Sequence, residues 1–197
     1  KMFIENPLKS NKQFGSIEVI CGSMFSGKTE ALIQKIKYAR NKKLNTIVFK
    51  PKIDNRYSNN SIVSHNNDKL QAIVIKSPQE ILNHTNGCDV IAIDEVQFFN
   101  NEIIKICDDL ANDGVQVILA GLDMDFNGDP FGPIPYLMAI AEKVTKLHAK
   151  CFRSGKLAQF TFRKSHDDKL FLIGEKKQYE ALSRIEYYKA MKEKSKK

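Results

Sequence analysis

The sequence predicts an α/β fold in which a mostly parallel β-sheet is flanked by helices and followed by a small antiparallel module. Short apolar runs alternate with helix-type segments between residues 17 and 120, and this alternation is typical of a parallel sheet that is covered on both faces. Beyond about residue 149 the pattern changes, because Ala158, Phe160 and Phe162 alternate with polar residues. Strands of that second kind predict antiparallel pairing.

The predicted strands are short runs rich in Val and Ile. In the main sheet they cover residues 17–21, 46–49, 72–75, 90–93 and 115–120. Their apolar character is nearly continuous, as expected for strands that are buried on both faces. One more short strand is predicted at residues 171–174, in the C-terminal module.

Two longer segments have the residue spacing of helices. Apolar residues recur at helical intervals within residues 28–40, and residues 101–112 are amphipathic. A shorter helix is predicted after Ser77, because Ser77 suits the N-cap, Pro78 the first helical position, and Glu80 the third position of a capping box.

The chain divides into four parts on the basis of these patterns. Residues 1–15 are polar and are expected to be a flexible leader, 16–149 the main α/β domain, 150–188 a small module that closes over a substrate, and 189–197 a basic tail. The polar segment 51–70 is long for an inert connection and is expected to be a functional flap.

Composition narrows the class of protein. The 197 residues are 42% hydrophobic, and they contain neither an apolar run of roughly 18 residues nor an apolar signal-peptide core, so we expect a cytoplasmic protein without a membrane span. The four cysteines are scattered without a CxxC pair, and we expect no disulfide framework. The net charge of +8 fits either a nucleic-acid partner or an enzyme for polyanionic nucleotides. Because much of the excess lies in the terminal lysines, we expect no nucleic-acid partner.

Residues 22–29 carry the first chemical motif. They read GSMFSGKT, which fits the phosphate-binding pattern G-x-x-x-x-G-K-[ST], and they lie between a predicted strand and a predicted helix. An ordinary glycine-rich turn is the alternative, but the strand and helix context favours a P-loop NTPase-type fold. We expect Lys28 to contact the β- and γ-phosphates of ATP and Thr29 to offer its hydroxyl to Mg²⁺. The ATP-binding residues of this loop are expected to be Gly22, Ser23, Met24, Phe25, Ser26, Gly27, Lys28 and Thr29.

An acidic pair follows the apolar strand 90–93. The carboxyl ends of the strands in an open parallel sheet border its ligand crevice, so Asp94 and Glu95 are expected to lie there. Asp94 suits the organisation of Mg²⁺ and its waters, and Glu95 suits a general base for a hydroxyl acceptor. The two motifs together predict an ATP- and Mg²⁺-dependent phosphotransferase.

Several longer motifs, taken in order, resemble the cytosolic, type II thymidine kinases. They are GSMFSGKT at 22–29, KPKIDNRY at 50–57, DEVQFF at 94–99, GLDMDF at 121–126 and DPFGPIP at 129–135. The resemblance runs from about residue 15 to residue 188 and implies that thymidine and ATP are the substrates. It also implies a homotetramer.

The resemblance assigns roles to individual residues. The family's catalytic base falls on Glu95, and further ATP-binding positions fall on Asp54, Arg56, Asp94 and Gln97. Thymidine contacts fall on Met24, Leu122, Phe126, Phe131 and Tyr179, and on main-chain groups of a lasso near residues 169–179. Core packing is the ordinary alternative for Phe126 and Phe131.

One departure from the family concerns a metal. The family's C-terminal module commonly carries a structural zinc, and the four ligand positions here are Cys151, Ser154, Ser183 and Glu186. A closed zinc site needs four Cys or His donors, so we expect no zinc. Packing of Phe152, Phe160, Phe162 and Phe171 is expected to hold the module instead.

Two other functions share some of these features with a kinase. A nucleic-acid-stimulated ATPase shares the acidic strand end and a basic charge, but a helicase motor needs a second domain that a chain of this length does not hold. A non-enzymatic nucleotide switch does not account for Glu95.

Overall fold

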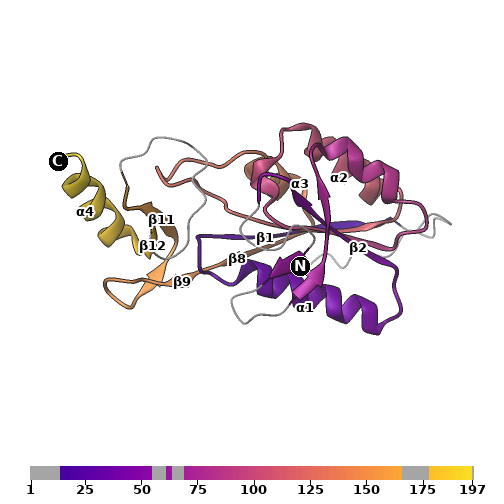
Figure 1. The fold of residues 1–197 in the computed structure, drawn as a ribbon, viewed down its shortest axis with the longest axis horizontal. Helices are drawn as coiled ribbons and strands as arrows, with labels where there is room; N and C mark the ends of the chain where they lie inside the picture. Colours follow the sequence, from indigo (N-terminus) through magenta and orange to yellow (C-terminus); the bar gives the residue numbers. More distant parts are fainter. Residues whose placement is uncertain (1–13, 55–60, 64–68, 166–177, 197) are drawn as a thin grey trace, which may run out of the picture.

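The computed structural model describes residues 14–54, 61–63, 69–165 and 178–196. Its centre is a six-stranded sheet with the order β5-β2-β6-β7-β1-β8, in which every neighbouring pair is parallel (Figure 1). The strands are β1 (Ser16–Gly22), β2 (Thr46–Pro51), β5 (Ile73–Ile75), β6 (Val90–Ile93), β7 (Gln116–Gly121) and β8 (Lys143–Leu147). This confirms the predicted α/β class with its parallel sheet.

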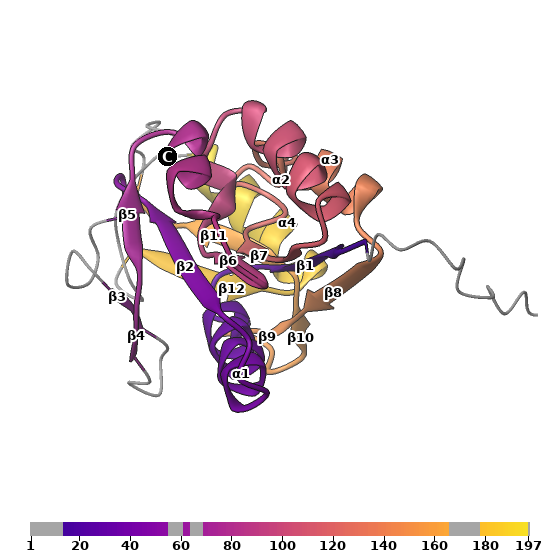
Figure 2. The ribbon, with the colours of Figure 1, turned by 90° about the vertical axis from the view of Figure 1, so that its right-hand side faces the viewer.

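Helices cover both faces of the sheet (Figure 2). Helix α1 (Lys28–Asn41) buries its apolar side on one face, against residues of β1, β2, β6 and β7. On the other face lie α2 (Glu102–Asn112), α3 (Ile134–Ile140) and the 3₁₀ helix η1 (Pro78–His84). The helix predicted after Ser77 is therefore a 3₁₀ helix, in which the Glu80 carboxylate accepts the Ser77 N–H at 3.1 Å.

The described part of the expected flap contains a small antiparallel pair. Strands β3 (Ser61–Val63) and β4 (Lys69–Gln71) pair with each other outside the main sheet. Residues 55–60 and 64–68 of this segment lie outside the described residues.

The C-terminal module is antiparallel, as predicted. Strand β9 (Ala149–Lys150) pairs with β10 (Leu157–Ala158), β11 (Phe160–Arg163) pairs with β12 (Tyr179–Leu182), and α4 (Arg184–Lys194) packs beside them (Figure 1). A separate apolar core contains Phe160, Phe162 and Tyr187. The strand predicted at 171–174 lies outside the described residues.

Two expectations about this region need correction. The expected boundary between residues 188 and 189 falls inside α4, so residues up to Lys194 form a helix rather than a loose tail. Phe152 is 48% exposed and does not join the buried core of the module, although Phe160 and Phe162 do. Phe171, the fourth aromatic residue assigned to that core, lies outside the described residues.

Two more features bear on the expectations from composition. All four cysteines are free and buried, which confirms that no disulfide framework is present. Among the residues that the structure describes, no helix is both long enough and apolar enough to cross a membrane.

Candidate active site

The phosphate loop joins β1 to α1, the context that the motif requires. Gly22 and Gly27 have φ values of +143° and +85°, a region of backbone space that glycine occupies without the strain other residues incur. A Cβ on Gly22 would also lie 2.2 Å from the carbonyl oxygen of Leu147, in the neighbouring strand β8. Gly27 is the N-cap of α1, so the loop leads directly to a helix N-terminus that favours anions.

Two side chains of the loop hold defined positions. The Lys28 side chain is buried, and its Nζ donates to the Ser23 carbonyl oxygen at 2.9 Å. The Thr29 hydroxyl donates to Asp94 Oδ2 at 3.1 Å, which joins the loop to the carboxyl end of β6. The predicted partners Thr29 and Asp94 are therefore in contact.

Glu95 is held in an uncommon conformation beside Asp94. Its φ and ψ are 53° and 38°, the left-handed region that costs a side-chain-bearing residue free energy and that is often found at functional sites. The Glu95 N–H donates to Asp94 Oδ1 at 3.0 Å, and the Glu95 side chain is buried.

Gln97 connects this acidic pair to the next strand end. Its Nε2 donates to Glu95 Oε2 at 2.5 Å, and its Oε1 accepts the Leu122 N–H at 3.0 Å. Gly121 is required beside it, because a Cβ there would lie 2.6 Å from Gln97 Oε1. With 2% of its surface exposed, Gln97 fixes the Glu95 carboxylate relative to the loop after β7.

The loop after β7 carries the two aromatic residues assigned to thymidine. The Asp125 carboxylate accepts the N–H groups of Asn127 and Asp129 at 2.8 and 3.0 Å, a side-chain-to-backbone pattern that stabilises the turn containing Phe126. Phe131 is buried, and its ring lies edge-on to Phe98 with centroids 5.9 Å apart. Phe131 thus has the core contacts of the ordinary alternative.

The C-terminal module contacts the same region through residues that sequence reasoning missed. The Met24 N–H donates to the Thr161 hydroxyl at 3.0 Å, and the Tyr187 hydroxyl donates to the Phe126 carbonyl oxygen at 2.9 Å. The guanidinium of Arg163 lies 3.7 Å from the centre of the Phe126 ring. These residues belong to β11 and α4, and no local motif points to them.

The other predicted residues are placed as follows. Asp54 is buried just after β2, at the same end of the sheet as Asp94. Tyr179 is buried in β12, and its hydroxyl oxygen accepts a hydrogen bond from Arg163 Nε at 3.1 Å. Arg56 and residues 169–177 of the expected lasso lie outside the described residues.

Two ionisable groups near the site are held neutral. Burial raises the pKa of the Cys21 thiol to about 11, and the Asp123 carboxylate adds to the rise, against lowering by Lys146 and Lys28. Burial and then the Asp125 carboxylate raise the pKa of Tyr187 to about 12. Cys21 is therefore not a nucleophile at neutral pH, and Tyr187 remains a hydroxyl donor.

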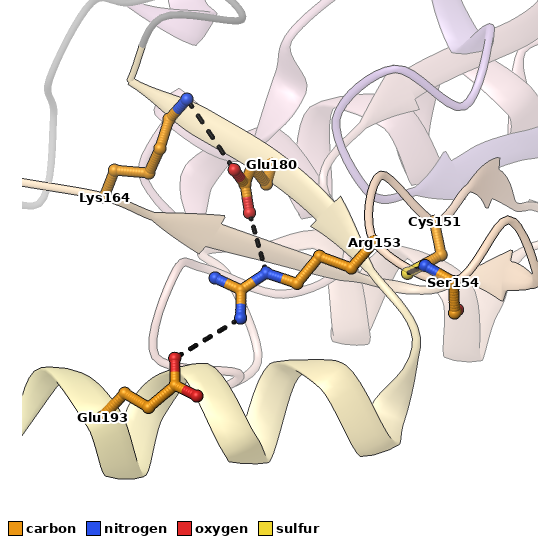
Figure 3. Close-up of polar contacts among 6 residues, drawn as sticks. All are labelled: Cys151, Arg153, Ser154, Lys164, Glu180 and Glu193. Atoms are coloured by element: carbon orange, nitrogen blue, oxygen red, sulfur yellow. Dashed lines mark hydrogen bonds and ion pairs between the residues drawn. The ribbon is translucent and has the colours of Figure 1, made fainter.

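The four positions aligned with the zinc ligands lie in the module. The Ser154 N–H donates to Cys151 Sγ at 3.5 Å, and nearby Arg153 forms ion pairs with Glu180 and Glu193 (Figure 3). Burial raises the pKa of Cys151, but the Ser154 side chain and then the backbone N–H groups of Ser183, Ser154 and Arg153 lower it by hydrogen bonding, to about 7. Within the described residues, no three His, Cys, Asp or Glu side chains are grouped to hold a metal ion. The absence of zinc stays a prediction.

A phosphate loop that opens a helix, with an acidic strand end bonded to it, is the arrangement of a P-loop NTPase-type fold. A family model described as "Thymidine kinase" matches residues 15–187. The chain belongs to the thymidine kinase family.

Curated proteins named thymidine kinase align with nearly the whole length of this chain. A thymidine kinase from Bacteroides fragilis is 49% identical over 98% of this chain and 96% of its own, and one from Bacteroides thetaiotaomicron is 48% identical over 96% and 95%. A third, from Porphyromonas gingivalis, is 44% identical over 94% and 91%. Among solved structures, AMPPCP-bound DnaA from Aquifex aeolicus aligns with 72% of this chain and 43% of its own at 16% identity, with a TM-score of 0.42, too weak a likeness to carry an argument.

Proposed function

We propose that this chain is a thymidine kinase that transfers the γ-phosphoryl group of ATP to the 5′-hydroxyl of thymidine, giving dTMP and ADP. The observation that carries the proposal is the continuous set of contacts from Thr29 through Asp94 and Glu95 to Gln97, in a member of the thymidine kinase family. The names of the relatives support thymidine as the acceptor.

The phosphate loop supports the binding of ATP. The Lys28 ammonium, which donates to the Ser23 carbonyl within the loop, is placed to move onto the β- and γ-phosphate oxygens when a nucleotide binds. Thr29 and Asp94 supply a hydroxyl and a carboxylate within 3.1 Å of each other, and Mg²⁺ prefers such oxygen donors. When bound, Mg²⁺ neutralises charge on the transferring phosphates.

Glu95 is proposed as the general base. In phosphoryl transfer the protein mainly positions the reactants and stabilises charge, and a carboxylate accepts the proton of the attacking hydroxyl. The Gln97 side chain donates to Glu95 Oε2, and this hydrogen bond positions the carboxylate that is proposed to meet the 5′-hydroxyl. As the 5′-hydroxyl oxygen bonds to the γ-phosphorus, its proton passes to Glu95, the bond between the γ-phosphorus and the bridging oxygen breaks, and ADP leaves.

The nucleoside is proposed to bind between the loop after β7 and the C-terminal module. Met24, Leu122, Phe126, Phe131 and Tyr179 remain the proposed contact residues. Main-chain groups of residues 169–179 are proposed to read the thymine edge. A pocket that pairs with one base edge leaves its own polar groups unpaired when the wrong base binds, so it discriminates strongly between pyrimidines.

The test is ADP release by the purified protein across a panel of acceptors. We expect thymidine to be the best substrate, deoxyuridine to be weaker because one methyl contact is worth roughly 1–3 kcal/mol, and deoxycytidine to be rejected. ADP release with single-stranded DNA and none with nucleosides would refute the proposal. We also propose that the active form is a homotetramer located in the cytoplasm. Analytical ultracentrifugation of the purified protein tests the oligomeric state.

A further inference from the structure

Arg163 is the largest side chain of the described residues that is fully buried. Only 1% of its surface is exposed, although a guanidinium is strongly hydrated in water. A buried cation needs compensating contacts, because its desolvation is costly. Its location and its contacts therefore indicate what it does.

The alternation of β11 places Arg163 on the side of the strand that faces the site. Phe160 and Phe162 point into the apolar core of the module, against Tyr187. Successive side chains of a strand point to opposite faces, so Thr161 and Arg163 share the other face. Thr161 on that face bonds the Met24 N–H of the phosphate loop, so Arg163 faces the same side.

Arg163 contacts two of the proposed thymidine residues at once. Its guanidinium lies 3.7 Å from the centre of the Phe126 ring, within the range of a cation–π contact, and its Nε donates to the Tyr179 hydroxyl at 3.1 Å. Tyr179 lies directly opposite Arg163 in the register of β11 with β12. Phe126 comes from the loop after β7, so Arg163 joins the two walls of the proposed pocket.

We infer that Arg163 is a positioning residue for thymidine, which sets the plane of the Phe126 ring and the direction of the Tyr179 hydroxyl; this inference rests on the proposed function. A hydroxyl oxygen that accepts a hydrogen bond from a guanidinium directs its own proton elsewhere, so Tyr179 is oriented as a donor. Arg163 acts through these two side chains. It therefore affects nucleoside binding and leaves the phosphate chemistry unchanged.

The test is the variant Arg163→Lys, which keeps the charge but loses the planar group that stacks on the ring and donates from Nε. We expect KM for thymidine to rise at least about 10-fold, with KM for ATP and kcat changed less than about 2-fold. The matched control is Arg184→Lys. Arg184 is exposed and lies 4.9 Å from the Phe160 ring, on the other side of β11 from Arg163, so the KM values of this variant should not change.

A second variant separates a local effect from a general loss of structure. Tyr179→Phe removes only the hydroxyl that accepts Arg163 Nε, and we expect a several-fold rise in KM for thymidine. If Arg163 acts partly through that hydroxyl, the rise in KM for thymidine in the double variant should be smaller than the product of the rises in the two single variants. Should Arg163→Lys fail to fold, the Tyr179→Phe result decides alone, and an unchanged KM for thymidine there overturns the inference.

The outcomes also distinguish this inference from the proposed function. If the unaltered protein does not phosphorylate thymidine, the proposed function has failed. If it does, and Arg163→Lys leaves both KM values unchanged or raises those for thymidine and ATP equally, only the role of Arg163 is refuted.

Discussion

Replacing Glu95 by Gln tests the proposed base with little change of shape. In the structure Gln97 Nε2 donates to Glu95 Oε2, and the amide oxygen of the new side chain can accept the same bond. Exchanging a charge-assisted hydrogen bond for a neutral one costs about 1 kcal/mol, so the variant should fold and melt only slightly earlier. We expect the left-handed backbone conformation at this position to be retained in the variant.

The expected effect on turnover is much larger than the effect on stability. A positioned general base contributes typically 10²–10⁴-fold, and an amide cannot accept the hydroxyl proton, so we expect kcat to fall at least about 10²-fold. Affinity for ATP should be nearly unchanged, because the proposed contacts of Lys28 with the phosphates and of Thr29 with Mg²⁺ do not involve Glu95.

The assay is steady-state ADP release with thymidine, together with a binding titration of ATP. The matched control is Glu102→Gln, because the Glu102 carboxylate likewise accepts side-chain amide N–H groups, those of Gln79 and Asn100, but lies exposed at the start of α2. Its kcat should equal that of the unaltered protein. A near-normal kcat in folded Glu95→Gln would refute the assignment of the base.

Three further predictions follow from particular contacts. Gly132→Ala should unfold at a lower urea concentration than Gly87→Ala. Both glycines have a positive φ, which costs an alanine about 1–2 kcal/mol of stability, but of the two only Gly132 would place a Cβ against a backbone atom, the Gln97 carbonyl oxygen at 2.4 Å. Equal unfolding midpoints would contradict the clash. Tyr187 has a raised pKa in the folded state, so its contribution to stability is complete below about pH 10 and is lost as the pH rises through about 12. Tyr187→Phe should therefore reduce the slope of the unfolding free energy against pH between these two values. An unchanged slope would show that Tyr187 is not its cause. Elemental analysis of the purified protein should find no bound zinc, and about one zinc per chain would contradict this.

The sheet was predictable where its strands are buried on both faces. The strands at the centre of the sheet have the apolar runs typical of a parallel sheet between helices, and all five predicted strands agree with the observed ones within one or two residues. β8 was missed because Lys143–Leu147 is an edge strand with three exposed residues and no apolar run. α3 was missed because its seven residues are apolar on every side and show no helical spacing.

The site was predictable as far as local motifs reach. The phosphate loop and the acidic pair are contiguous in sequence, and the fold brings them together through Thr29 and Asp94. Thr161, Arg163 and Tyr187 were not found, because each acts through a contact with a residue more than 15 positions away. The role of Gln97 as a connection to Leu122 likewise depends on how β6 and β7 end side by side.

The C-terminal module is built so that its packing and the proposed nucleoside pocket depend on each other. Tyr187 stacks on Phe160 with ring centroids 4.5 Å apart, and its hydroxyl bonds the Phe126 carbonyl oxygen outside the module. Gly128 keeps this contact close, because it leaves room beside the Tyr187 hydroxyl and the Phe160 ring. Only Cys151 is a strong metal ligand among the four positions aligned with the zinc site, so we predict that the stacked rings, and not a bound zinc ion, hold the module in order. A loss of packing around Tyr187 should therefore weaken thymidine binding before it weakens ATP binding, since the phosphate loop belongs to the main sheet.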